Sequence, residues 1–539
     1  MVGGVGAGTR TLVRMGAIDV NEVNFTLPDG RVLLDRASFR IGDRDHVALV
    51  GANGAGKTTL MRMIAGDEAP SSGGIHIEGR IGVMRQFIGS IRDGKTVADL
   101  MLDLAPQTVR EAAQRLQRAE DRAATDGSED AGMRLANAHT AWGDAGGWDA
   151  EVLWDACTTI ALRQGFAEAK DRPLSQLSGG EQKRLALEAL LRGEDDVLIL
   201  DEPDNYLDIP TKEWLAETIR ASLKTILFVT HDRHLLADVA TKIVTIEGQT
   251  AWVHGAGFDT YDDEREARRS RIDAEFARYQ DERRRLKKLL VEYRVRSTIS
   301  EKFAPRVKET LKRIERHNKV DAPTRVQDQS IDVRLAGGRT GKRAVRIDEV
   351  ELTGLTDPFS IEIDAGDRVA VVGPNGTGKS HFLRLLAGDT VDHEGTWRLG
   401  ANVVPGHFSQ THEHPELDGI PIVDTIARGP ADRNRAIGAL RRYELAIAAD
   451  RSFDTLSGGQ QARLQILLLE LGGATLLLLD EPTDNLDLES AEALEQGLAA
   501  FEGTVVSVSH DRWFLKSFDR FLIFDRDGSV VELDEPIFT

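Results

Sequence analysis

The sequence predicts an α/β protein made of two related phosphate-binding domains joined by a basic helical hairpin, with a helical arm inserted in the first domain. The first observation is a glycine-rich loop at 51–58 that recurs at 373–380. Both copies fit the pattern G-x-x-x-x-G-K-[ST], follow an apolar strand-like run and precede a helical pattern. The second is a set of later motifs that recurs at one spacing. The third is a strongly basic segment between the copies.

Length, composition and charge limit the protein classes. The 539 residues suffice for two or three domains with substantial cores, and a net charge of −20 argues against a protein that coats nucleic acid with its whole surface. The single cysteine, Cys157, cannot form an internal disulfide. Every apolar run is shorter than the ~18–20 residues that cross a bilayer. Residues 1–15 are glycine-rich, lack the apolar core of a signal peptide and are expected to be a disordered tail. We therefore expect a cytoplasmic protein.

The first domain is expected at 16–256. A strand–turn–strand pattern leads into the first glycine-rich loop and a helix at 58–65. Residues 97–165 then change to charged, alanine-rich helical stretches, which predict a protruding arm at about 105–145. The continuous apolar runs at 197–200 and 226–229 are typical of strands buried on both faces of a parallel sheet.

The second domain, expected at 326–539, repeats the motifs of the first. Three pairs of motif residues are each 279 positions apart: Ser178 and Ser457, Glu202 and Glu481, and His231 and His510. The loop lysines, Lys57 and Lys379, are 322 positions apart, so the first domain carries 43 additional residues between its loop and Ser178. These residues fall in the predicted arm. A repeat of this length indicates a duplicated domain.

Residues 257–325 are expected to form a basic helical linker. Positions 265–319 hold 19 basic and 9 acidic side chains inside an acidic protein. Apolar residues recur in steps of four and three on both sides of a polar tip at 297–302, which predicts an antiparallel hairpin with a narrow apolar seam. The start of its second helix is left open, because Thr298 and Glu301 resemble a capping box whereas Pro305 favours a later first turn. The charge surplus favours an RNA-phosphate-binding element over a solvated spacer.

Both loops have the residue types that hold a nucleotide. Glycines let backbone N–H groups point at phosphate oxygens, and the lysine reaches the terminal phosphates. The expected phosphate-loop contacts are Gly51, Asn53, Gly54, Gly56, Lys57, Thr58 and Thr59, and Gly373, Asn375, Gly376, Gly378, Lys379, Ser380 and His381. Two serine–glycine helix starts are expected to bind nucleotide as well, although they also fit a simple helix cap: Ser178, Gly179 and Gly180, and Ser457, Gly458 and Gly459.

Acidic residues complete the predicted sites. Asp201 and Asp480 each end a buried apolar strand, where a carboxylate can hold Mg²⁺ or its bound water. The next residues, Glu202 and Glu481, stand where they can orient or deprotonate an attacking water. The expected catalytic residues are Glu202, Glu481, His231 and His510, the histidines being placed to contact the terminal phosphate. The expected Mg²⁺ ligands are Thr58, Gln86, Asp201, Ser380, Gln410 and Asp480; Gln86 and Gln410 are also expected to contact the nucleotide.

These motifs resemble those of ATP-binding-cassette proteins. Walker A (51–58 and 373–380), the signature (177–181 and 456–460) and Walker B (197–202 and 476–481) each occur twice. The inserted arm and the basic linker are similar to those of the ABC-F branch. The resemblance implies two ATP molecules with Mg²⁺ between cassettes that pair within one chain, and hydrolysis of ATP to ADP and phosphate. By that analogy, Lys57 and Glu202 face Ser457 and Gly459, whereas Lys379 and Glu481 face Ser178 and Gly180.

The resemblance also implies a partner, the ribosome. In ABC-F proteins the linker enters near the tRNA exit site, with 23S rRNA and the peptidyl-tRNA as its surroundings. ATP binding would lock the protein on the ribosome and hydrolysis would release it, either to modulate elongation or to protect against antibiotics; the short tip is closer to a general translation factor. The alternative is the cytoplasmic ATPase subunit of an exporter, which leaves arm and linker unexplained. A duplicated-cassette DNA-repair ATPase would need zinc-binding cysteine clusters, which a chain with one cysteine cannot build.

Several positions depart from the ABC-F pattern. After Walker B, the family commonly reads Asp-Glu-Pro-Thr-Asn-His-Leu-Asp, so Asp204 and Tyr206 are unusual in the first copy, whereas the second copy is closer to type. His381 stands where a second threonine is common. An adenine-stacking aromatic is not evident, because Leu27 holds the aligned position beside Phe25, and the region of Leu355 offers no candidate. We therefore expect two active but unequal ATP sites with weak base discrimination.

Overall fold

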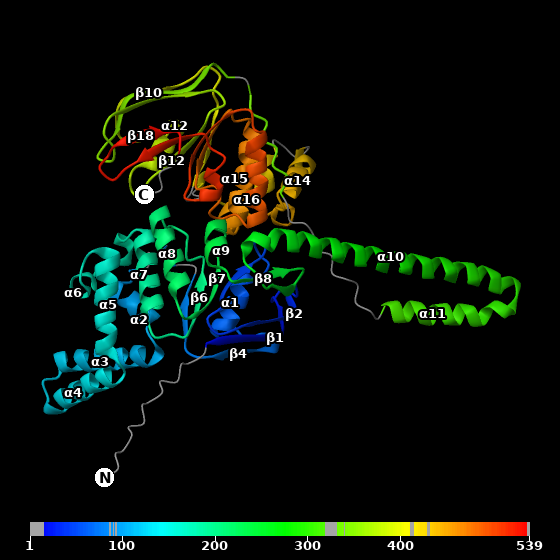
Figure 1. Cartoon of the computed structure of the whole chain (residues 1–539), viewed down its shortest axis with the longest axis horizontal. Coiled ribbons are helices and arrows are strands. Elements are labelled where there is room, and N and C mark those ends of the chain that lie inside the picture. Colours follow the sequence, from blue (N-terminus) through cyan, green and yellow to red (C-terminus); the bar gives the residue numbers. More distant parts are fainter. Residues whose placement is uncertain are drawn as a thin grey trace, which may run out of the picture.

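The computed structural model describes residues 16–85, 88–89, 91, 94–318, 331–338, 340–409, 414–427 and 432–535. The predicted tail at 1–15, Gln86 and Gln410 lie outside the described residues. Figure 1 shows two α/β domains stacked on each other, with a long helical hairpin that leaves their junction on one side and a second helix pair that leaves the first domain on the other. This arrangement confirms the predicted fold class.

Each domain is built on two sheets. The first domain has a three-stranded antiparallel sheet, β2-β1-β4, and a six-stranded sheet, β5-β6-β7-β3-β8-β9, that is parallel except for its last pair. Their strands are β1 (Ala17–Thr26), β2 (Val32–Ile41), β3 (His46–Val50), β4 (Ser72–Glu78), β5 (Ile81–Met84), β6 (Val197–Asp201), β7 (Thr225–Val229), β8 (Lys242–Glu247) and β9 (Thr250–His254).

The second domain repeats both sheets, as β11-β10-β13 and β14-β15-β16-β12-β17-β18. Its strands are β10 (Arg343–Leu352), β11 (Phe359–Asp364), β12 (Arg368–Val372), β13 (His393–Leu399), β14 (Pro405–Phe408), β15 (Leu476–Asp480), β16 (Thr504–Val508), β17 (Arg520–Phe524) and β18 (Val530–Leu533). All five residues of β6, β7, β15 and β16 are buried, as their continuous apolar runs predict. Because these parallel strands end at one edge of each sheet, the predicted motifs that follow them meet there.

Helices cover the sheets. The first domain holds α1 (Lys57–Ala65), α2 (Val97–Leu104), α5 (Gly147–Leu162), α6 (Phe166–Ala169), α7 (Gly179–Arg192), α8 (Ile209–Ala221) and α9 (Arg233–Val239). The second holds α12 (Lys379–Ala387), α13 (Ile422–Ile426), α14 (Arg433–Arg442), α15 (Gly458–Gly472), α16 (Leu488–Ala500) and α17 (Arg512–Leu515). Of the described helices, none combines the length and the apolar composition that crossing a membrane requires.

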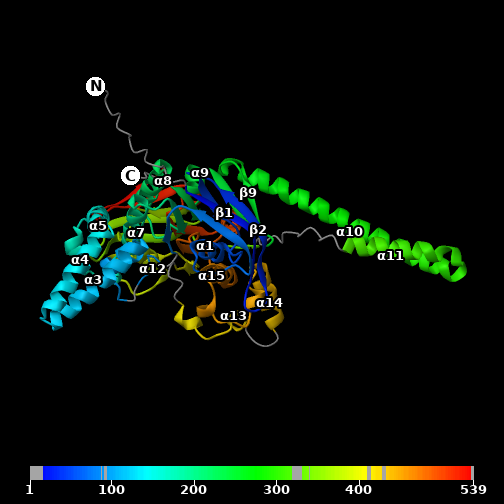
Figure 2. The ribbon, with the colours of Figure 1, turned by 90° about the horizontal axis from the view of Figure 1, so that it is seen from below.

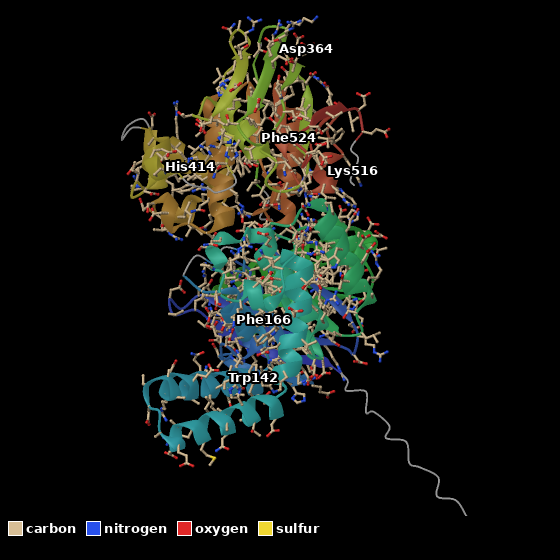
Figure 3. The ribbon with its side chains drawn as sticks, turned by 90° about the vertical axis from the view of Figure 1, so that its left-hand side faces the viewer. Trp142, Phe166, Asp364, His414, Lys516 and Phe524 are labelled. Carbon is tan, nitrogen blue, oxygen red and sulfur yellow. The ribbon has the colours of Figure 1, made fainter. Side chains whose placement is uncertain are left out.

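The arm is an antiparallel pair, α3 (Gln107–Thr125) and α4 (Glu129–Asp144), that projects beneath the first domain (Figure 3). Ser128 caps α4 by accepting a hydrogen bond from the Ala131 backbone N–H at 3.2 Å, a role that serine favours. At the base of the arm, the Trp142 ring packs 6.3 Å from Trp154, which lies 5.2 Å from Phe166. These buried aromatic contacts fix the arm to the domain.

The linker is a hairpin of α10 (Tyr261–Ile299) and α11 (Ala304–Asn318), which lie side by side in Figures 1 and 2. Tyr279 packs on His317 at 4.2 Å along the seam. The tip starts later than the expected 297–302, because α10 continues through Ile299. The Thr298 hydroxyl donates to the Val295 carbonyl instead of capping a new helix. The second helix begins at Ala304, so Pro305 takes the first-turn position that proline favours.

Candidate functional site

Two cavities lie where the domains face each other. Site 1, of about 370 Å³, lies between the loop at 51–58 and the start of α15; site 2, of about 310 Å³, lies between the loop at 373–380 and the start of α7. The predicted residues that line site 1 are Asn53, Gly54, Gly56, Lys57, Thr58, Thr59, Glu202, His231, Ser457, Gly458 and Gly459. Those that line site 2 are Ser178, Gly179, Gly180, Asn375, Gly376, Gly378, Lys379, Ser380, His381, Asp480, Glu481 and His510.

The loop lysines are held by their own loops. Lys57 Nζ donates to the Gly51 and Ala52 carbonyls at 2.6 and 3.2 Å, and Lys379 makes the same pair of contacts in its own loop, to Gly373 and Pro374. Gly51 and Gly373 therefore support the lysine rather than line the cavity. The helices behind the loops begin after glycines with φ of 103° and 97°, a left-handed backbone that glycine adopts without strain.

The signature glycines allow the two domains to meet closely. The Asn53 side-chain amide donates to the Asn485 carbonyl of the second domain at 3.1 Å, and a Cβ on Gly459 would lie 2.3 Å from that amide nitrogen. Asn375 makes the equivalent contact with the Tyr206 carbonyl at 2.9 Å. A side chain on Gly459 would therefore displace the Asn53 amide from its contact with the second domain. Ser178 also caps α7 in a capping box with Glu181, so the cap and the cavity-lining position coexist.

In site 1, Glu202 is held by an amide. Its φ of 49° is unusual for a non-glycine residue, and Asn205 Nδ2 donates to its Oε2 at 2.8 Å. Burial, together with Glu202, raises the pKa of Asp201 to about 6. Burial and the nearby Lys57 lower the pKa of His231 to about 4, so the imidazole is neutral near pH 7. A neutral histidine beside a glutamate can accept or donate a hydrogen bond at a phosphate.

In site 2, Glu481 is held by a backbone N–H. Its φ is 48°, and the His510 N–H donates to its Oε2 at 3.0 Å. His510 Nε2 lies 3.2 Å from Asn375 Oδ1. Burial, followed by the carboxylates of Asp484 and Asp480, raises the pKa of Glu481 to about 8. The residue that corresponds to Asn205 of site 1 is thus an acid here, Asp484.

The two aspartates suit a magnesium ion. The Thr58 hydroxyl acts to lower the pKa of Asp201, and the Ser380 hydroxyl acts to lower that of Asp480, so each hydroxyl lies near its aspartate. Within the described residues, Oδ1 of each aspartate is buried without a hydrogen-bond partner. Mg²⁺ prefers such oxygen ligands and takes the rest of its octahedron from phosphate and water.

The cavities also contain residues that the motifs did not predict. Leu27, Arg31 and Leu33 line site 1, and Leu355 lines site 2. Phe25, the aromatic near the expected stacking position, is buried in the core instead. Lys212, Asp204 and Asp484 line site 2. Asp204 was flagged by its departure from the family pattern, whereas no local pattern singles out Lys212.

Comparison with known proteins decides the family. The ABC transporter family model matches residues 34–205 and 356–484. ABC transporter F family member 2 of Arabidopsis thaliana is 30% identical over 523 residues, which are 94% of this chain and 76% of that protein. The chain belongs to the ABC-F family. Both domains of this ABC-F protein are therefore ATP-binding cassettes, and such domains indicate ATPase activity.

Further relatives and solved structures agree. A Mycobacteroides abscessus protein named "Antibiotic resistance protein" is 49% identical over 549 residues, covering 97% of this chain and all of that protein. The tylosin resistance ATP-binding protein TlrC of Streptomyces fradiae is 30% identical, and the match covers 94% of this chain and 96% of that protein. The solved RNase-L Inhibitor shares the fold at a TM-score of 0.53, with 18% identity over 95% of this chain and 90% of that chain.

Proposed function

We propose that this ABC-F ATPase binds the ribosome while ATP holds its cassettes closed, and that hydrolysis of ATP to ADP and phosphate releases it. Glu202 and Glu481 would orient the attacking water, with His231 and His510 at the terminal phosphate. Lys57 and Lys379 would hold the phosphates. The Mg²⁺ would be held by Thr58 with Asp201 in site 1 and by Ser380 with Asp480 in site 2.

The observation that carries this proposal is an ionic cluster at the base of the hairpin, here called the arginine clamp: Arg265, Arg269, Glu247 and Glu489. Arg265 and Arg269 of α10 both contact Glu247 in the first cassette, at 3.2 and 2.7 Å. Both also pair with Glu489 on α16 of the second cassette, Arg269 at 2.5 Å. Because these side chains are largely buried, the contacts require the two cassettes to be together. Closure would thereby set the direction in which the hairpin points.

The clamp connects to site 1 through α16. Asp487 caps this helix by accepting from the Ser490 N–H, and the same side chain accepts from the Asn53 backbone N–H of the first cassette at 2.8 Å. Glu489 lies in the first turn of the same helix. A shift of the loop at 51–58 would therefore move the clamp. This link supports coupling between nucleotide and hairpin.

The hairpin has the chemistry of an RNA-binding element. Its 19 basic side chains exceed its acidic ones by ten, in a protein whose net charge is −20. Near the tip, Arg306 lies over the Tyr293 ring at 5.8 Å and over the Phe303 ring at 5.6 Å. Charge surplus confined to one projecting element favours phosphate contacts there. We propose 23S rRNA and the peptidyl-tRNA near the tRNA exit site as its surroundings, with the arm as a second contact.

Among ABC-F roles, protection of the ribosome from an antibiotic is favoured over general control of elongation. The support is the 49% identical relative, whose name is an antibiotic resistance protein, and TlrC, which is named for tylosin. A deletion strain should then be more sensitive to ribosome-targeting antibiotics, and the wild-type gene should restore resistance. If the deletion strain keeps its antibiotic susceptibility but its ribosomes stall on particular messages, control of elongation would be favoured instead.

The ribosome proposal is tested with a variant that closes without hydrolysing. E202Q/E481Q with ATP should sediment with 70S ribosomes, and wild type with ADP should not. K57A/K379A, which loses the phosphate contacts, is the matched control and should remain free. An E202Q/E481Q protein that stays free of ribosomes in ATP would overturn the proposal.

A further inference from the structure

The ammonium group of Lys212 lies largely buried at the cassette interface. Lys212, in the first turn of α8, lines site 2 although it belongs to the first cassette. Its Nζ is 3.1 Å from Asp232 Oδ2 and donates to the His510 carbonyl of the second cassette at 3.4 Å. Only 15% of the side chain is exposed. A lysine at a helix N-terminus opposes the helix dipole, so its position requires compensating negative charge.

That charge comes from four aspartates, here called the central acidic cluster: Asp204 and Asp232 of the first cassette, and Asp484 and Asp511 of the second. Burial lowers the pKa of Lys212, but these four carboxylates raise it by more, so the ammonium form is retained. Burial raises the pKa of Asp204 and of Asp484 to about 6, and Lys212 opposes both shifts. Closure thus brings acids from both cassettes around Lys212, and Lys183 also acts on Asp204 and Asp484.

Lys212 and the residues of the central acidic cluster are not all repeated in both cassettes. The 279-residue shift relates Asp232 to Asp511, but it relates Lys212 to Ala491 and Asp204 to Thr483. It also relates Asn205 to Asp484. In site 1, the Asn205 amide itself holds the glutamate. In site 2, the corresponding carboxylate stands beside Glu481, and Lys212 is the cation that balances it.

We propose that Lys212 is a positioning residue for site 2, reaching from the first cassette to hold the His510 backbone beside Glu481 while its charge offsets that of Asp484. His510 is the link to the reacting centre, because its carbonyl accepts from Lys212 while its own N–H donates to Glu481. Site 1 has no equivalent requirement, since its corresponding position is Ala491. The inference rests on the proposed roles of Glu202 and Glu481, but not on the ribosome.

The test isolates one site at a time. K212M in the E202Q background, where site 2 alone hydrolyses, should lower kcat by about tenfold or more, as expected when a buried charge loses its partner. K212M in the E481Q background, where site 1 alone hydrolyses, should change kcat by less than about twofold. K212R in the E202Q background should restore most of the rate. K242M, which removes a lysine paired with Asp45 at 2.7 Å away from both cavities, is the matched control.

A second variant separates positioning from simple loss of stability. K212M/D484N removes the cation together with one acid and recreates the asparagine of site 1, so it should recover part of the site 2 rate lost in K212M. Equal loss at both sites, or no recovery by K212R and D484N, would overturn the inference. So would loss of all hydrolysis in E202Q alone. Undiminished hydrolysis in E202Q/E481Q would instead contradict the proposed glutamate roles.

Discussion

Sites 1 and 2 descend from one repeated motif set, and their loops, lysines, glutamates and histidines occupy equivalent positions. The groups around the glutamates differ. Site 1 holds Glu202 with the Asn205 amide, whereas site 2 holds Glu481 with the His510 N–H and places Asp484 and Lys212 nearby. The difference teaches that a duplicated site can keep its phosphate-binding parts while the surrounding charges are rebuilt.

The sites also differ in their connection to the linker. Site 1 contacts α16 through Asn53 and Asp487, and α16 carries Glu489 of the arginine clamp. At the position equivalent to Glu489, the first cassette has Pro210, which cannot make an ionic contact. Site 1 is therefore linked by contacts through α16 to the base of the hairpin, whereas site 2 borders Lys212 at the cassette interface.

The largest effect is expected from the glutamates themselves. E202Q/E481Q should lower hydrolysis by about 100-fold or more, because both water-orienting carboxylates are lost. Each single variant should retain one active site, with E481Q faster than E202Q because the Asn205 amide already orients Glu202. Phosphate release at saturating ATP measures this. Equal rates of the two single variants would show that the structural difference between the sites does not affect hydrolysis.

An exchange of the neighbouring residue tests why the sites differ. N205D in the E481Q background replaces a hydrogen-bond donor to Glu202 with a carboxylate, so site 1 should slow by about tenfold, the cost of a lost hydrogen bond to a charged group. The reciprocal D484N in the E202Q background should change site 2 by less, since Lys212 already compensates Asp484. If N205D leaves site 1 at full rate, the amide contact does not explain the difference.

The arginine clamp should matter for binding more than for hydrolysis. E489Q removes the second-cassette partner of Arg265 and Arg269, so we expect ribosome affinity to fall by about fivefold, consistent with a coupling energy near 1 kcal/mol. ATP hydrolysis without ribosomes should stay within about twofold. E492Q is the control: Glu492 lies on the same helix, but it is outside the arginine clamp and its contact with Arg233 is long, at 3.9 Å. Equal effects of E489Q and E492Q would argue against coupling through the clamp.

The smallest effect concerns pH. Asp204 and Asp484 have a pKa of about 6 in the closed interface, against ~3.9 when exposed. The closed form therefore binds more protons between pH 4 and 6, so closure should weaken as pH rises through this window, with Glu481, whose pKa is about 8, extending the weakening to higher pH. Energy transfer between dyes on V152C and I447C, at side chains that are 73% and 100% exposed, reports closure. D204N/D484N should flatten the response; an unchanged response would exclude these aspartates as its source.

Much of the fold was predictable because its signals are local. The glycine loops, the buried apolar strands and the Ser128 cap each reflect the backbone preferences of a few neighbouring residues, and the two domains, the arm and the hairpin are confirmed. The hairpin tip was placed too early, because α10 continues through Ile299 even though that side chain is 82% exposed. The candidate site residues, Gln86 and Gln410 aside, lie in or beside the two cavities, and their roles stay proposals.

By itself, the sequence determined that the protein has two phosphate loops, two signature helices and one basic hairpin, because each follows from short-range pattern and composition. Only the tertiary structure decided which charges meet. Lys212 and Asp484, or Arg265 and Glu489, are more than 200 positions apart. No periodicity relates such pairs, and their contacts arise only when the sheets align the loops at the interface. The sequence already makes the two sites unequal, but only the closed fold brings the differing residues into contact.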